Sequence, residues 1–211
     1  MQNPEKIHIP ATNAWLIIPG FDRKQGTTSS MEILKELLMT KPVIGTVDWI
    51  GIARASRAPI ESLEFAEIVQ GGIRGDHHCR PGRPSKRQVT LIQAEHLPVV
   101  ASFLGMKSIA PELLRRNIVV SGLNLSALRY TRFRIGSALL EGTGNCPPCS
   151  RMEENLGPGG YFAMVNHGGI TAIVVEEGTF SVGDAVRPID CRTAVLSRSE
   201  PKPNNSSSGS D

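Results

Sequence analysis

The loop at 141–153, with the sequence EGTGNCPPCSRME, contains residue types that suit covalent or metal chemistry. Two prolines separate Cys146 from Cys149, and Arg151 follows two positions later. A cationic neighbour lowers the pKa of a thiol, and the resulting thiolate is both a nucleophile and a metal ligand. Three interpretations are open: a redox pair, part of a structural zinc site, or one reactive or metal-binding cysteine.

The context of the two thiols favours the third interpretation. A thioredoxin-like pair belongs in a strand–helix–strand unit, whereas this region is rich in β-type sequence. Structural zinc needs a second pair of ligands, but Cys79 and Cys191 each stand alone. We therefore expect one working cysteine in the loop, with the other as a helper or bystander, and we expect Cys191 to be idle.

A second cluster lies in the segment GGIRGDHHCRPG at 71–82. Its glycines permit tight or left-handed backbone, and Asp76, His77, His78 and Cys79 bring four polar side chains into one loop. Zinc binding is one hypothesis, although adjacent histidines and a cysteine lack the usual spacing of a closed zinc site. The other hypothesis is a hairpin loop in which Asp76 bonds its own backbone.

His167 lies in the segment VNHGG, after the cysteine loop and one expected short helix. This order predicts that Cys149 and His167 open toward the same face of the fold. The following glycines allow the backbone to approach a neighbour closely. A purely structural histidine is the alternative, and it is the commoner role for a loop histidine.

Basic side chains stand at two further junctions. Arg115 and Arg116 end a helical segment directly before a β-type run, and Lys86, Arg87 and Gln88 enter another. Adjacent arginines can bind phosphate or carboxylate through paired hydrogen bonds. The alternative is that they complement a helix carboxyl end and are solvated.

These clusters fall at the ends of short β-type runs, where loops carry function on a rigid scaffold. The last run, TAIVVEEGTFSVGDAVRPI, predicts a three-stranded meander that closes a small barrel. The pattern predicts a mainly β fold, a barrel or sandwich with a few short helices, and excludes a doubly wound parallel sheet. The β-type runs are VIGTVDWIGIA, FAEIVQGGI, RQVTLI, NIVVSGL, FRIGSALLEGTG and the last run, and the helical segments are AEHLPVVASFLG, PELLRR and SRMEENLG.

The composition of the chain limits the classes of protein to which it can belong. The chain has 211 residues, with 23 Lys+Arg and 20 Asp+Glu, so its charge of +3 does not indicate a nucleic-acid partner. No apolar run reaches the roughly 18 residues of a membrane span, and the start does not resemble a signal peptide. We expect a cytoplasmic protein with reduced thiols. We divide it into an extension at 1–42 with one amphipathic helix, a domain at 43–190 and a disordered tail at 191–211.

Taken in order, these motifs resemble the MOSC domain family, named for the carboxyl-terminal domain of molybdenum cofactor sulfurases. The resemblance rests on GGIRGDHH, RQVTLIQAEHL, LLRRNIVVSGLNL, FRIGSALLEGTGNCPPCSRME, GGYFAMVNHGGI and FSVGDAVRP, and it runs from about Val43 to Pro188. It is closest to the small stand-alone bacterial members, because no aminotransferase-like domain precedes the core. It implies a β-barrel-like domain that binds the molybdenum cofactor, a pterin dithiolene with a phosphate. At the level of the family alone, pyridoxal phosphate is also associated.

The resemblance also implies roles for individual residues. Cys149 matches the family cysteine that ligates molybdenum or carries sulfur for it, and Cys146 departs from relatives with a single cysteine here. Asp76, His78 and His167 are expected to orient cofactor and substrate or to donate protons. The expected contacts of the pterin and its phosphate are Arg74, Lys86, Arg87, Gln88, Arg115, Arg116, Asn117 and Arg151.

Three functions follow from these expectations. The first is an oxidoreductase that reduces N-hydroxylated or N-oxide compounds at a Cys149-ligated molybdenum, with electrons from a reductase partner. The second is a carrier that hands sulfur, as a persulfide, or the cofactor to an acceptor molybdoenzyme. The third is a zinc-stabilised β module without catalysis. A small-molecule substrate is expected only for the first.

Overall fold

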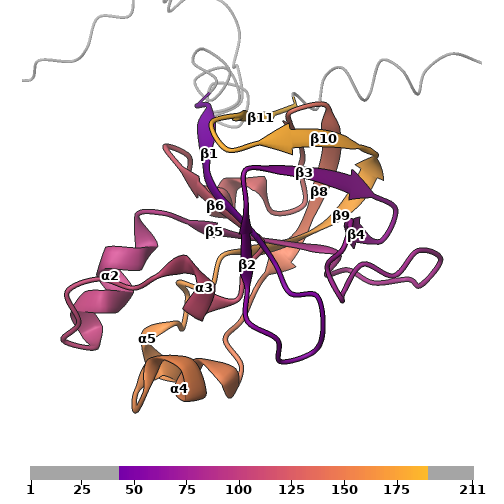
Figure 1. Cartoon of the computed structure of the whole chain (residues 1–211). Helices are drawn as coiled ribbons and strands as arrows, with labels where there is room; N and C mark the ends of the chain where they lie inside the picture. Colours follow the sequence, from indigo (N-terminus) through magenta and orange to yellow (C-terminus); the bar gives the residue numbers. More distant parts are fainter. Residues whose placement is uncertain (1–42, 190–211) are drawn as a thin grey trace, which may run out of the picture. The chain divides into compact units, whose positions relative to one another are not determined.

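Figure 1 shows the computed structural model, which describes residues 43–189. The expected amphipathic helix within 1–42 and the expected disordered tail at 191–211 lie outside these residues. So does Cys191. Among the described residues, no helix has the length and apolar character needed to cross a membrane.

Seven strands form a closed barrel. Around the barrel the order is β11, β7, β8, β9, β5, β6 and β1, and β1 then pairs with β11 to close it. β5 and β6 pair in parallel, whereas the other neighbours in the ring are antiparallel. The strands span Gly45–Ile52 (β1), Val89–Gln93 (β5), Ile118–Ser121 (β6), Arg132–Ile135 (β7), Ala138–Asn145 (β8), Ile170–Glu176 (β9) and Ala185–Pro188 (β11). The predicted mainly β, barrel-like fold is confirmed.

A second sheet is formed by β3 (Phe65–Val69), β4 (Gly72–Ile73) and β10 (Gly178–Ser181), and β2 (Glu61–Leu63) pairs antiparallel with the end of β1. The expected meander of the last three strands is wrong. Both edges of β9 are already used by β8 and β5, so β10 finds no free edge there and pairs with β3 instead. The last strand nevertheless closes the barrel, as expected, because β11 pairs with β7 and β1.

Four α-helices are present among residues 43–189, and Figure 1 shows them on one side of the strands. They are α2 (His96–Phe103), α3 (Pro111–Leu114), α4 (Arg151–Leu156) and α5 (Gly160–Ala163), which agree with the predicted helical segments and add α5. Pro111 begins α3, where a missing N–H costs nothing, and Gly157 ends α4 with a positive φ of 84°.

Two apolar clusters hold these layers together. The larger contains the inward side chains of the barrel and of the second sheet, including the fully buried Phe133 and Phe180. The smaller lies beneath the helices and includes Leu114 and Met152. α3 and α4 are therefore anchored to the outside of the barrel. Their ends carry the arginine pair and the cysteine loop.

Candidate functional site

The structure gathers side chains from four separate segments around one cavity of about 340 Å³, which we call the thiol cavity. These segments are the β1–β2 loop, the β4–β5 loop, the α3–β6 junction and the start of α4. The lining residues are Ser56, Arg57, His77, His78, Arg87, Arg115, Arg116, Cys149, Arg151 and Met152.

The two cysteines of the loop have different environments. Cys149 is exposed and lines the thiol cavity, whereas Cys146 is 1% exposed and does not. The backbone N–H of Cys146 donates to Gly169 O at 2.9 Å, so the loop is tied to the start of β9. Both thiols are free, as is Cys79. The arrangement presents one thiol to a ligand and packs the other.

Arg116 supports the cysteine loop through hydrogen bonds to backbone carbonyl groups. Its side chain is buried at 3% exposure, and its Nε donates to Gly168 O at 2.8 Å. Its Nη2 donates to Cys146 O at 3.4 Å, and its Nη1 donates to Leu114 O at 2.9 Å. Burial lowers the pKa of Arg116, while the nearby thiols of Cys146 and Cys149 act in the opposite direction. The guanidinium thus reaches the site without a neutralising carboxylate among the described residues.

Arg115 takes the unusual backbone conformation that turns α3 into β6. Its φ is +53°, in the left-handed region, and its Nη1 donates to Ala58 O at 2.9 Å. Burial and the charge of Arg151 lower the pKa of Arg115. Because of the positive φ, the side chains of the consecutive arginines make different contacts. Arg116 is committed mainly to backbone carbonyls, whereas Arg115 has donors left for a ligand.

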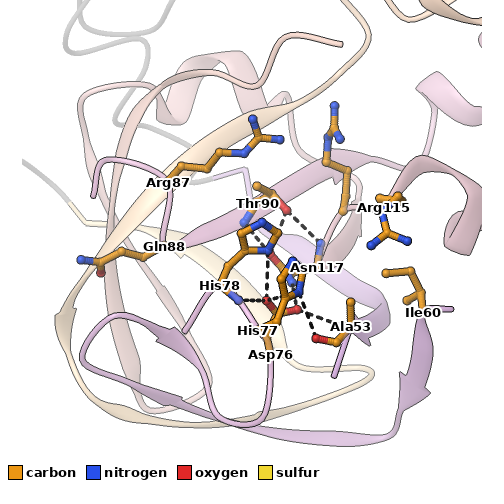
Figure 2. A pocket seen from close by; sticks show the side chains of 11 residues that line it. Ala53, Ile60, Asp76, His77, His78, Arg87, Gln88, Thr90, Arg115 and Asn117 are labelled. Atoms are coloured by element: carbon orange, nitrogen blue, oxygen red, sulfur yellow. Dashed lines mark hydrogen bonds and ion pairs between the residues drawn. The ribbon is translucent and has the colours of Figure 1, made fainter. Parts of the chain in front are cut away.

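Asp76 is the centre of a hydrogen-bond network in a smaller hollow that shares several lining residues with the thiol cavity (Figure 2). It is 7% exposed and accepts hydrogen bonds from Ala53 N at 3.0 Å, His78 N at 2.8 Å and Asn117 Nδ2 at 3.3 Å. Burial alone would raise the pKa of this carboxyl, but hydrogen bonds from His78 and Ala53 outweigh it and lower the pKa. The bond from His78 N agrees with the hypothesis of a loop in which Asp76 bonds its own backbone.

The two histidines of this loop each use one ring nitrogen for support. His78 Nδ1 lies 3.2 Å from Asp76 Oδ1, and His77 Nδ1 lies 3.1 Å from Ala53 O. Each contact places the ring proton on Nδ1 and leaves Nε2 free. The rings lie against one another, with centroids 3.7 Å apart. The site thus has two imidazole nitrogens that are available to a ligand.

A metal cation is a poor match for this loop alone. Possible ligand atoms of Asp76, His77 and His78 lie within 4.8 Å of one another. However, both oxygens of Asp76 already accept hydrogen bonds, and the surrounding arginines repel a divalent cation. Nor is Cys79 part of the group. The loop is better suited to supporting an anion than to binding zinc.

Among the described residues, most arginines of the thiol cavity lack a carboxylate partner, whereas several arginines elsewhere on the barrel have one. Away from the cavity, Arg54, Arg74, Arg132 and Arg134 each have a carboxylate partner. In the cavity only Arg151 has one, Glu154 at 2.9 Å, as far as residues 43–189 show. Like charges left close together without counter-charges are unfavourable. The cavity therefore has the electrostatics of an anion site beside an exposed thiol.

Most of the predicted site residues meet here, and several do not. His78, Arg87, Arg115, Arg116, Cys149 and Arg151 line the thiol cavity. Asp76, Gln88 and Asn117 line a smaller inner hollow of about 40 Å³, drawn in Figure 2, which shares both histidines with the cavity.

Arg74, Lys86 and His167 lie elsewhere. Arg74 pairs with Glu67 across the β3–β4 hairpin, and Lys86 contributes its carbonyl oxygen to a bond from Thr143. His167 packs edge-on against His96, with ring centroids 4.8 Å apart, and lies near Phe103. It does not line the thiol cavity, so the structure does not bring it to the face that Cys149 occupies.

Four lining residues are absent from the predicted catalytic and cofactor-binding residues: Ser56, Arg57, His77 and Met152. Arg57 has a positive φ of 65° in the segment ARASRAP, far along the chain from the cysteines. Two arginines among small residues are the only signal that this segment offers, and only Arg57 lines the cavity. His77 was visible as part of the histidine loop, but nothing in the sequence distinguished its role from that of His78.

Comparison with known proteins supports the architecture. A sequence model of the MOSC domain matches residues 74–187, more than half of the chain. The crystal structure of the YuaD protein from Bacillus subtilis has a TM-score of 0.63 at 22% identity, covering 71% of this chain and 99% of that one. YiiM from Escherichia coli has a TM-score of 0.54 at 18% identity, covering 69% and 70%. No curated protein matches the sequence. At these identities the solved structures establish the fold alone.

Proposed function

The chain belongs to the MOSC domain family, which is associated with molybdenum cofactor binding, and on this basis we propose that the thiol cavity holds that cofactor and reduces N-hydroxylated or N-oxide compounds. One observation carries the proposal. The cavity combines an exposed thiol with five arginines, of which only Arg151 has a carboxylate partner among the described residues. A dithiolene pterin with a phosphate needs both kinds of partner.

The residues present fit this group by their chemistry. A thiolate is a soft donor that suits a metal already held by sulfur, and Cys149 offers one. Guanidinium groups bind phosphate through paired hydrogen bonds, and Arg57, Arg87 and Arg115 have no carboxylate partner in the described part of the chain. When bound, the cofactor supplies two-electron redox chemistry.

The protein's own part in the reaction is to orient the ligands and to supply protons. Reduction of an N-hydroxyl compound consumes two electrons and two protons, breaks the N–O bond and releases an amine and water. The electrons come from a separate reductase of the flavin or iron–sulfur class. His78 is held by Asp76 through Nδ1, so its Nε2 is free to take up a proton from solvent and to pass it to the departing oxygen.

A carrier function is the second candidate, because the exposure of Cys149 favours it too. An accessible thiolate attacks the outer sulfur of a donor persulfide, releases the donor thiol and holds that sulfur as its own persulfide until an acceptor thiolate takes it in the same way. The zinc-stabilised module has less support. Within residues 43–189, the one cluster of three potential metal ligands contains no cysteine.

Metal analysis tests the proposal. The full chain is expressed in cells that make the cofactor, purified without oxygen and assayed for molybdenum, zinc and released pterin per chain. We expect stoichiometric molybdenum and pterin in the native protein and in Cys79→Ser, whose thiol lies outside the cavity, and loss of both in Cys149→Ser. Stoichiometric zinc without pterin would refute the proposal.

Two further results separate the remaining alternatives. Loss of metal in Cys146→Ala but not in Cys149→Ala would identify Cys146 as the ligand. Turnover of an N-hydroxylated compound with an artificial electron donor distinguishes an enzyme from a carrier, because a carrier binds the cofactor but does not reduce the compound.

A further inference from the structure

A second cavity of about 310 Å³ adjoins the thiol cavity, and we call it the outer cavity. Arg80, Arg83 and Ser85 line it together with His78 and Arg87, which line the thiol cavity as well. The outer cavity is formed by the β4–β5 loop, which continues from the histidine loop toward β5. No residue of its lining carries a carboxylate.

The side chains of the arginines in this loop are unpaired within the part of the chain that the structure describes. Among the described residues, Arg80, Arg83 and Arg87 form neither an ion pair nor a side-chain hydrogen bond. The sequence explains this, since the stretch from His77 to Ala94 contains four basic residues and no acidic one. Three guanidinium groups around one hollow provide many directed N–H donors for an oxyanion.

The loop that carries these arginines is anchored at several points. The backbone N–H of Arg83 donates to Arg80 O at 3.2 Å, and that of Arg87 donates to Ser85 Oγ at 3.1 Å. At Gly71, which has a φ of +94°, an added Cβ would lie 2.6 Å from the carbonyl carbon of Arg80. The loop backbone thus packs directly on the β3–β4 turn, and the arginines project from a supported scaffold.

We propose that the outer cavity binds an anionic group, a phosphate monoester or a carboxylate, of the small molecule that is reduced in the thiol cavity. This inference rests on the proposed function. The cofactor carries a phosphate, and the arginines of the thiol cavity provide for it. The outer cavity adds Arg80 and Arg83 to Arg87, which it shares with the thiol cavity, and this additional positive charge favours a second anion. The substrate class is therefore an anionic N-hydroxylated or N-oxide compound.

Calorimetric titration with inorganic phosphate tests the anion site without any turnover. The cofactor-free full chain is compared with Arg80→Gln/Arg83→Gln and with Arg187→Gln, which removes an exposed arginine of β11 outside both cavities. We expect two phosphates per native chain and per control chain, and one per double variant. Unchanged stoichiometry and affinity in the double variant would overturn the proposal.

The second arm distinguishes the substrate's anion from the cofactor's phosphate. Molybdenum and pterin content should be the same in the double variant as in the native protein. Loss of both would assign these arginines to the cofactor and overturn the substrate proposal.

The third arm compares kcat/KM for an N-hydroxylated aromatic compound and its carboxylated analogue. We expect the native preference for the carboxylated compound to fall by roughly tenfold for each arginine removed, as for loss of a charge-assisted hydrogen bond. An unchanged preference in the double variant would also overturn the proposal that the outer cavity binds the anionic group of the substrate. If neither compound is turned over by the native protein, the proposed function fails, while the titration still decides whether the outer cavity binds anions.

Discussion

Asp76 shows how a single buried carboxylate organises the site. Its two oxygens link the end of β1, the histidine loop and the start of β6 through Ala53, His78 and Asn117. Asn117 in turn accepts hydrogen bonds from Thr90 on β5. An ionised carboxylate that accepts several hydrogen bonds stabilises the fold only while it remains ionised. The network therefore makes the stability of this region depend on pH.

We predict that Asp76→Asn lowers the free energy of unfolding by about 2 kcal/mol at pH 7, the scale of an unsatisfied buried donor. Because the folded pKa of Asp76 lies below its ordinary value, its contribution is complete above that value and is lost as the pH falls through the folded pKa. The difference between native and variant proteins should thus shrink toward pH 3. Urea unfolding at both pH values measures it.

The control for this prediction is Asp48→Asn, which removes an exposed carboxylate on β1. It should change the free energy of unfolding by less than about 0.5 kcal/mol at pH 7. A difference between native protein and Asp76→Asn that is equal at pH 7 and pH 3 would contradict the assignment of the buried charge.

At the scale of elements, the sequence was a good guide to where strands and helices lie and a poor guide to their partners. Glycine-rich turns and short apolar runs are local signals, and they placed β7, β8 and α3 correctly. The partner of β10 depends on which edges of β9 are free, and that depends on strands far away in the sequence. The expected meander failed for this reason.

The same limit applies to the site. Spacing identified Cys146 and Cys149 as a pair, but only their environments show which one is exposed. Sequence order suggested that His167 faces Cys149, yet its ring packs against His96. Residue type predicts what a side chain can do, whereas its accessibility is determined by the packing of the elements around it.

The start of β9 allows a test of how tightly the cysteine loop is built onto the barrel. Gly169 has a φ of +82°, and an added Cβ would lie 1.9 Å from Leu91 O. We predict that Gly169→Ala lowers the free energy of unfolding by about 3 kcal/mol or more. The backbone near Leu91 must move away from the added Cβ, and the alanine itself is strained at a positive φ. Chemical denaturation measures the loss.

Gly82→Ala is the matched control, because its φ is +77° but nothing lies within 4 Å of the added Cβ. It should cost only about 1 to 2 kcal/mol, the strain of a left-handed alanine. Equal losses in the two variants would show that close packing at Gly169 is unimportant.

At the scale of the whole described domain, the barrel depends on one short closure. β1 and β11 meet through the pairs Gly45 with Val186 and Thr46 with Ala185, and Val186 is fully buried. β11 also covers the edge of β7. Without it, two strands would expose unpaired N–H and C=O groups, which promote association with other chains.

We predict that a chain truncated after Asp184 loses cooperative unfolding and aggregates, because the edges of β1 and β7 become free. A chain truncated after Asp190 keeps every strand of the barrel and should behave as the full chain does. Size-exclusion chromatography and thermal denaturation compare the three. A monomeric, cooperatively unfolding 1–184 chain would show that closure is dispensable.

The pairing of β1 with β11 can form only late in synthesis, because the two strands lie near opposite ends of the described chain. Every residue of the thiol cavity, from Ser56 to Met152, leaves the ribosome before Val186, the partner of Gly45. Pairing between strands so distant in sequence forms late, because the chain entropy of closing a long loop must be overcome first. A newly made chain thus carries its arginines and Cys149 on an unfinished scaffold, and any ligand of the cavity meets a complete binding site only after translation has passed the last strand.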